Sequence, residues 1–284
     1  MGKLMLGSQE VSPAIVTSIG IPRNIDNNGV FTSLGITSFS LPKSARDLGD
    51  MALNSAFHSC TSLTSVDLSS LVSTSGKNAL ASAFYNCTSL TSVDLSSLTS
   101  GRLSSTFYGC TALTSVDLSS LTSGSLPNTF SNCTALTSVG FPSVRACSEA
   151  RSFLSTFSGC SNLTSVDFSN LQEVSYESGM FGTFRDCTSL ISFSFPSLSI
   201  LSGKTAISQA FYRCTSLTSL SFPALNSNSF GSNTDQFNSM LGGVSNCTVH
   251  FPSNLQSVIG SWSSVTNGFG GTNTTVLFDL PATS

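Results

Sequence analysis

The sequence predicts an α/β solenoid, with short parallel strands on a concave sheet, short helices or turns on the convex side, and non-repeat end caps. The first observation is a repeated phrase: CTSLTSVDLSSL begins at Cys60 and at Cys87, and it returns at Cys110 with one Ser changed to Ala. The second is composition, since only 9% of the 284 residues are charged while 39% are hydrophobic. Such a chain can bury a core, and it must wet its surface mainly with Ser, Thr and Asn.

A Phe-x-x-Cys motif marks the repeat unit. It occurs seven times in phase, at steps of 27, 23, 23, 27, 27 and 27 residues. Steps of this size are typical of solenoids, in which each unit buries its apolar face only against its neighbours. The seven motifs begin at Phe57, Phe84, Phe107, Phe130, Phe157, Phe184 and Phe211.

Each unit is expected to contribute one short strand. Leu63, Val66 and Leu68 have the L-x-x-L-x-L spacing of a leucine-rich repeat. Because side chains alternate along a strand, Val66 and Leu68 should point inward and Asp67 outward. Eight or nine such strands, spaced about 4.8 Å apart, would make a sheet roughly 40 Å long.

The remainder of each unit varies in length. The long form, such as VSTSGKNALASA before Phe84, is four residues longer than TSGRLSST before Phe107. Because four residues make about one helical turn, we expect a short helix on the convex side of the long units. The two short units, which end at Phe107 and Phe130, should carry only a turn or a 3₁₀ segment.

The array has atypical ends, from which we predict three regions. Residues 1–30 should form a small β module or cap that could serve for attachment, with KLMLG and AIVTSIGI as its two short strands. Residues 31–252 hold the repeats, and ITSFSLP at Ile36–Pro42 is an atypical upstream unit. Residues 253–284 should form a C-terminal cap, whose segment 274–280 is a final strand.

The repeat unit, F-x-x-C-x-x-L-x-x-[VIL]-x-[LF], resembles the BspA-like leucine-rich repeats of gut and oral bacteria, from Gly35 to about Pro252. This resemblance implies a right-handed leucine-rich solenoid and, on cell surfaces, adhesion to host or microbial ligands. The flanks KLMLGSQEVSPAIV and NLQSVIGSW…GFGGTNTTVLFDL are similar to the ends of leucine-rich proteins encoded in gut Firmicutes genomes, often near phage genes. The second resemblance implies a virion protein.

Composition also excludes partners. A net charge of −3 argues against nucleic acid and anionic membranes, and no apolar run is long enough to span a bilayer. The N-terminus lacks the apolar core of a secretory signal, so a native intracellular start is the simplest interpretation. A leader removed and replaced by a Met is the alternative.

The predicted ligand surface is the outward column of the concave sheet. Asp67, Asp94 and Asp117 should lie about 5 Å apart, which would raise their pKa values or recruit a cation such as Ca²⁺. The alternative is that these carboxylates serve only solubility. The full predicted surface comprises Ser65, Asp67, Ser69, Ser92, Asp94, Ser96, Ser115, Asp117, Ser119, Ser165, Asp167 and Ser169. Because the column reads Gly140 and then Asp167, any charge-dependent binding should lie toward the N-terminal half.

The remaining candidates favour structure over chemistry. The Cys column should be a buried, reduced core layer, whereas Cys147, outside it, should be the more exposed thiol. Tyr85, Tyr108 and Tyr212 should lie at the outer rim, where a partner could stack on them. Neither His58 nor His250 has a nucleophile and an acid at catalytic spacing, so we predict no enzyme, no cofactor and no metal site apart from the speculative aspartate row.

Two functional hypotheses follow. The first is a phage or prophage virion protein, made in the host cytoplasm, that displays the solenoid for adhesion to a protein or glycan on cells or mucus. Residues 1–30 would attach it to other virion proteins. The second is a bacterial cell-surface adhesin of the BspA-like type.

Overall fold

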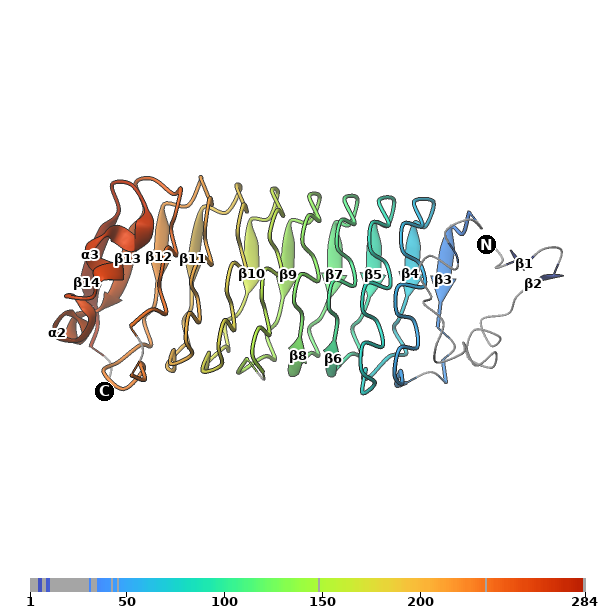
Figure 1. Ribbon diagram of the computed structural model, residues 1–284, viewed down its shortest axis with the longest axis horizontal. Coiled ribbons are helices and arrows are strands. Elements are labelled where there is room, and N and C mark those ends of the chain that lie inside the picture. Colours follow the sequence, from blue (N-terminus) through green and yellow to red (C-terminus); the bar gives the residue numbers. More distant parts are fainter. Residues whose placement is uncertain are drawn as a thin grey trace.

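The computed structural model is an elongated stack of coils, each of which contributes one strand to the same face (Figure 1). The structure describes residues 5–6, 9–10, 31, 35–41, 43–44, 46–147, 149–232 and 234–282. Within this part of the chain, ten strands follow one another along the stack, one or two more than expected. They are β3 (Ser38–Ser40), β4 (Ser65–Asp67), β5 (Ser92–Asp94), β7 (Ser115–Asp117), β9 (Ser138–Gly140), β10 (Ser165–Asp167), β11 (Ser192–Ser194), β12 (Ser219–Ser221), β13 (Thr248–Pro252) and β14 (Thr275–Leu280).

The strands pair in parallel, as the repeat predicts. They form three ladders in the orders β3-β4-β5-β7, β9-β10 and β11-β12-β13-β14. The atypical unit at Ile36 is confirmed, because Phe39 of β3 pairs with Val66 of β4. In the middle of β4 and β5 Val66 and Val93 are buried, whereas the residues on either side of them are exposed. This alternation confirms the predicted inward and outward faces.

The two short units add a second small sheet. Strand β6 (Ser100–Arg102) pairs in parallel with β8 (Ser123–Ser125), and Gly101 lies opposite Gly124. Elsewhere in the described chain this column is reduced to single bridges, such as Asp47 with Ser73. The shorter connection therefore draws two coils close enough to pair along a second edge.

The core consists of ladders of identical residues. The Phe of each Phe-x-x-Cys motif is fully buried, and from Phe57 to Phe211 the neighbouring ring centroids lie 5.1–5.8 Å apart. The rings are nearly parallel, at 4–18°. Stacked aromatic pairs add about 0.5–1.5 kcal/mol beyond the area they bury. Each unit thus contributes one equivalent layer to the core, as the repeat predicts.

The prediction of short convex helices is wrong. Residues 50–59, like the corresponding segments of later units, are runs of turns. Within the run, alternate N–H groups donate three residues back, as Ala56 does to Leu53, while those between them donate to the next coil, as Phe57 does to Ala83. Left-handed residues at four-residue steps, such as Met51, Ser55 and Ser59, make this alternation possible. A helix would keep its hydrogen bonds within the coil, whereas these turns bond the coils together.

The ends of the stack differ from its middle. β1 (Met5–Leu6) pairs antiparallel with β2 (Gln9–Glu10), so the first expected N-terminal strand is present, while the segment AIVTSIGI lies outside the described residues. At the other end β14 confirms the final strand predicted for residues 274–280. Between β13 and β14 lie η2 (Ser253–Leu255), α2 (Gln256–Ile259), α3 (Ser263–Thr266) and η3 (Gly268–Gly270). The boundaries at residues 30 and 252 stay predictions.

The short α2 and α3 are the only α-helices in the described part of the chain. None of the helices described is long and apolar enough to cross a membrane.

Candidate functional site

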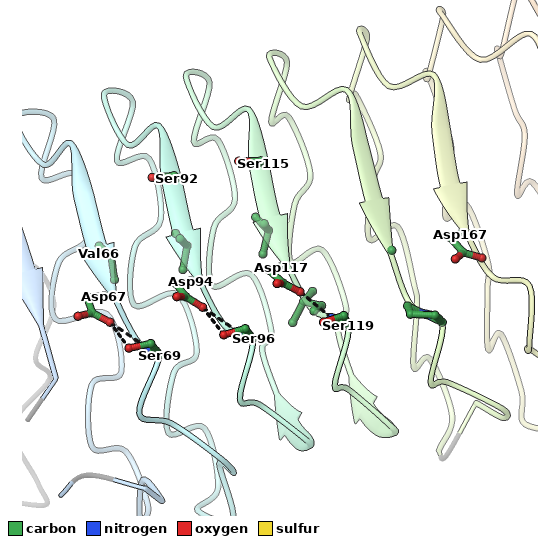
Figure 2. Close-up of a pocket in the computed structure, with 15 residues that line it drawn as sticks. Val66, Asp67, Ser69, Ser92, Asp94, Ser96, Ser115, Asp117, Ser119 and Asp167 are labelled. Carbon is green, nitrogen blue, oxygen red and sulfur yellow. Dashed lines mark hydrogen bonds between the residues drawn. The ribbon is translucent and has the colours of Figure 1, made fainter. Parts of the chain in front are cut away.

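The aspartate column forms as predicted. Asp67 lies opposite Asp94, and Asp94 lies opposite Asp117, in consecutive strands of one ladder. Gly140 then interrupts the column and lies opposite Asp167 in the next ladder. Figure 2 shows the carboxylates of β4, β5 and β7 side by side at the ends of their strands.

A shallow groove of about 630 Å³ runs along this column. Nine of the twelve predicted surface residues line it, whereas Ser65, Ser165 and Ser169 lie outside it. The remaining lining residues were not among those predicted, and they include Pro142 beside Gly140, where the column breaks. The lining comprises Val66, Asp67, Ser69, Ser92, Val93, Asp94, Ser96, Ser115, Val116, Asp117, Leu118, Ser119, Gly140, Pro142 and Asp167.

Serines hold the carboxylates in place. The backbone N–H groups of Ser69, Ser96, Ser119 and Ser169 each donate to Oδ1 of the aspartate two residues earlier, over 2.8–3.0 Å. The hydroxyls of Ser69 and Ser96 also donate to the same oxygens, over 2.6 Å (Figure 2). This is the Asx-turn geometry in which a short carboxylate caps its own backbone.

The expected rise in pKa is wrong for two of the aspartates. The hydroxyl and backbone N–H of Ser69 hold the pKa of Asp67 below its usual value, and Lys43 acts in the same direction. The backbone N–H and hydroxyl of Ser119 likewise lower the pKa of Asp117. Hydrogen bonds to the charged form therefore outweigh the opposing effect of burial.

The same column shows where an aspartate is needed. The residue two positions after it begins a tight turn, as in the bond from Leu71 N–H to the Leu68 carbonyl. In the four units with Asp, this turn residue is Ser, and its N–H is bound by the carboxylate. In five of the six described strands without Asp in this column, the residue two positions later is Pro, which has no N–H; in the sixth, β14, Leu277 is followed by Asp279. The five pairs are Ser40 with Pro42, Gly140 with Pro142, Ser194 with Pro196, Ser221 with Pro223 and His250 with Pro252.

A metal site is not apparent in the described residues. Within them, no three His, Cys, Asp or Glu side chains gather as a metal ion requires. The aspartate row is extended along the sheet, and serines already bind one oxygen of each of its carboxylates. The cation row stays a prediction, and its direct test is calcium binding.

The cysteines are free and buried, as predicted for the column. The thiols of Cys87, Cys110 and Cys133 each donate to the carbonyl of the preceding unit's Phe, over 3.1–3.2 Å. Burial raises the pKa of Cys110 to about 12, which suppresses its thiolate. Cys147 was expected to be exposed, but it is only 1% exposed and burial raises its pKa to about 12. That prediction is wrong because Ala146 bridges to Glu173 in the next coil, and the Cys147 side chain beside it lies in the hydrophobic core.

The convex tyrosines are half-buried, but two of them are already stacked. The rings of His58, Tyr85 and Tyr108 lie parallel, with centroids 4.8 and 4.5 Å apart. They fill one another's faces, so a partner would meet mainly their edges. The ring of Tyr212 instead has the guanidinium groups of Arg185 and Arg213 at 4.8 and 5.5 Å from its centroid.

His250 has an acid partner that its spacing in the sequence did not reveal. Its Nδ1 lies 3.0 Å from both carboxylate oxygens of Asp279 on β14. Ser221 is its neighbour on β12, but the hydroxyl of Ser221 donates to Ser194 over 2.8 Å. The Ser221 hydroxyl is thus bonded to Ser194, and the His250–Asp279 pair joins β13 and β14.

A second groove, of about 410 Å³, lies over β6 and β8. Serine, threonine and glycine line most of it, and the ion pair of Arg102 with Glu149, 2.8 Å long and exposed, lies at its margin. The repeat pattern did not predict this groove, because it exists only where two short units are adjacent.

The comparisons with solved structures find bacterial leucine-rich repeat proteins. A leucine-rich repeat protein of T. pallidum is 21% identical over 66% of this chain and 73% of its own, with a TM-score of 0.37. A leucine-rich cell surface protein of Faecalibacterium prausnitzii is 16% identical over 84% of this chain and 88% of its own, with a TM-score of 0.41. No curated protein matches the chain.

The match to a family is more direct. The family described as BspA type leucine-rich repeat region matches in six copies, over residues 23–153, 54–182 and 155–262. These matches span most of the chain and coincide with the stack of coils from β3 to β13. The chain is a leucine-rich repeat solenoid and belongs to the BspA-type leucine-rich repeat family.

Proposed function

We propose that the protein is a non-enzymatic binding protein whose aspartate groove holds a glycan on a cell or mucus surface. The observation that supports this is the groove itself, in which exposed serine hydroxyls and carboxylates recur from strand to strand. Repeat stacks of this kind present extended curved surfaces for binding. A repeating polar polymer fits such a surface better than a compact small molecule does.

The groove chemistry suits sugar hydroxyls. The Ser N–H groups bind Oδ1 of Asp94 and Asp167, so the second oxygen of each carboxylate keeps its lone pairs for a donor. Ser92 and Ser115 are exposed at the N-terminal ends of β5 and β7, and their hydroxyls can both donate and accept hydrogen bonds. Val66, Val93 and Val116 are buried and form the floor of the groove between these polar groups.

The proposed place of display is the surface of a phage or prophage particle, with residues 1–30 as the attachment to other virion proteins. The similarity of both flanks to leucine-rich proteins encoded near phage genes supports this location. The bacterial cell surface is the second location, and family membership is compatible with either.

Filling the groove tests the binding proposal. Ser115→Arg places a long side chain in the groove, and Ser192→Arg makes the same change at the corresponding exposed position of β11, outside the groove lining. On a glycan array and on immobilised mucin, Ser115→Arg should weaken binding at least tenfold, whereas Ser192→Arg should bind like the parent chain. Equal binding by both variants would exclude the groove, and binding only to deglycosylated surfaces would make the ligand a protein.

Mass spectrometry of purified particles tests the location. Peptides of this chain should co-purify with capsid and tail proteins and resist protease treatment only where the particle covers them. Their presence in a cell-envelope fraction, and absence from particles, would favour the cell-surface adhesin.

A further inference from the structure

Strand β14 leaves one edge of the sheet open. It is the outermost strand of the ladder β11-β12-β13-β14, and no described strand pairs with its outer side. The N–H of Thr275 donates to the carbonyl of Cys247, over 2.9 Å, toward β13. Because backbone groups alternate along a strand, the N–H and C=O of Val276 point away from β13, toward the open edge.

This edge has one of the usual protections against pairing, a register irregularity in the β13–β14 ladder after Leu277, but it lacks the others. Exposed edge strands are normally short, or carry Lys, Pro or unpaired charges that repel another strand. β14 is six residues long, twice the length of most strands in the stack, and its sequence TVLFDL contains neither Lys nor Pro. Its single charge, Asp279, is already paired with His250.

The apolar side chains of β14 are also incompletely covered. Phe278 stacks on Phe251 at 5.8 Å and ends an aromatic ladder that runs through Phe222. Val276 and Phe278 pack against the core but are only half-buried. On the opposite face Leu277 is 37% exposed, one of four exposed large hydrophobic residues in the described chain.

We propose that β14 pairs antiparallel with β14 of a second copy, on a two-fold axis through Leu277. In this register Val276 lies opposite Phe278 of the second copy, and Leu277 lies opposite its counterpart. Inward side chains then meet inward ones, as sheet alternation requires. The outward-pointing backbone of Val276 also faces the position at which antiparallel strands exchange two hydrogen bonds.

A second copy fits this edge for a physical reason. A shift of one residue would place core side chains opposite solvent-facing ones, so only registers that pair even-numbered with even-numbered residues keep the core continuous. Among these, the register centred on Leu277 also covers Leu277 with an identical side chain. A two-fold contact of this kind closes on itself, whereas head-to-tail stacking of coils would grow into filaments.

Disulfide trapping tests the register. Leu277→Cys places two thiols on the axis, where directly opposite non-hydrogen-bonded residues have Cα atoms about 4.5 Å apart, within disulfide range. All nine native cysteines are buried, so the new thiol is the accessible one. Mild oxidation of the full chain should give a covalent dimer with a 277–277 linkage. The control, Thr275→Cys, is exposed but lies about 13 Å from its counterpart in this register, and it should crosslink several-fold less.

Sedimentation across a range of protein concentrations tests the association without a crosslink. The parent chain and Leu277→Gln should dimerise, whereas Leu277→Glu should stay monomeric, since it places like charges directly opposite each other. A parent chain that is monomeric throughout, or equal crosslinking at positions 275 and 277, overturns the proposal. Species larger than dimers without a 277–277 linkage would instead indicate head-to-tail stacking.

Discussion

Two groups of strands end by different chemistry on the same backbone: β4, β5 and β7 in the first half of the array, and β11 and β12 in the second. In the first half Asp94 caps the N–H of Ser96, and in the second half Pro196 and Pro223 stand at the same turn position and have no N–H to cap. The difference teaches that what stays constant between these repeats is a turn without an unpaired N–H, and that the residue that achieves this can change. In the four repeats that end in Asp-x-Ser, the carboxylate binds the serine N–H that a proline lacks.

This comparison also explains why the groove lies toward the N-terminal half. Strand ends with the Asp-x-Ser sequence, called Asp-type ends, bring carboxylates to the exposed face of the strands, and three of the four occur in consecutive units. Phe fills the layer beneath in four of the five units that carry the proline, as in the stacking of Phe195 on Phe222 at 5.4 Å, and in one unit that carries the aspartate, where Phe168 follows Asp167. The charged groove therefore lies mainly over units with Leu in this layer, and the aromatic layer lies toward the C-terminal end of the stack.

The largest effect should come from the aromatic layer of the second half. Phe222 is fully buried and stacks on Phe195 and Phe251, at 5.4 and 5.3 Å. Phe222→Ala should lower the free energy of unfolding by about 3–5 kcal/mol, because it removes buried area and leaves a cavity between two rings. Urea unfolding followed by circular dichroism measures this change. The control, Phe278→Ala, is at the half-buried end of the ladder and should cost less than half as much.

Replacing the Asp94–Ser96 strand end with one that carries proline should test the comparison directly. Asp94→Ala removes the acceptor of the Ser96 N–H and hydroxyl, and it should cost about 1 kcal/mol, like the loss of a helix cap. Ser96→Pro in the same chain removes the N–H that needed an acceptor, so the double variant should recover most of this loss. A double-mutant cycle in urea gives the coupling between the two positions. Purely additive changes would show that the aspartate does not serve the turn.

Much of this architecture can be predicted from the sequence. Phe57 and its six counterparts, Cys60 and Val66 recur in phase, and in-phase repetition determines both the core layers and the outward Asp67. The convex side could not be predicted, because four extra residues are compatible with one helical turn or with a run of turns that bonds neighbouring coils. Cys147 was misjudged for a related reason, since its burial depends on how a variable segment folds back.

The position of the aspartates could be predicted from the sequence, but the direction of their pKa shifts could not. Alternation placed Asp67, Asp94 and Asp117 in one column, yet the expected self-repulsion overlooked the serine two residues later. The exchange of Asp-Ser for Pro was visible in the sequence and would have revealed it. The pair of His250 with Asp279 could not be foreseen, because 29 residues and four short helices separate its members.

A smaller effect should appear in acid, and only where strands end in aspartate. The pKa values of Asp67 and Asp117 are lower in the folded chain than in the unfolded chain, so unfolding takes up protons in acid. Their stabilisation is complete above the unfolded pKa, about 3.9, and is lost as the pH falls through the folded values. When the pH is lowered from about 6 to below about 3.9, the double variant Asp67→Asn/Asp117→Asn should therefore lose less thermal stability than the parent. Thermal melts across this range check it, and parallel pH profiles would contradict it.

The smallest expected effect is that of calcium. Ca²⁺ takes about six to eight oxygen ligands, which must converge on one point. The carboxylates of Asp67, Asp94 and Asp117 instead follow the sheet in a row, and each already accepts a serine N–H through Oδ1. Titration calorimetry with Ca²⁺ should thus show no binding heat, and melts with Ca²⁺ or a chelator should coincide. A calcium-dependent rise in melting temperature that Asp94→Asn abolishes would instead show that the row is a cation site, and the Asp-type strand ends would then have a second use beyond their turns.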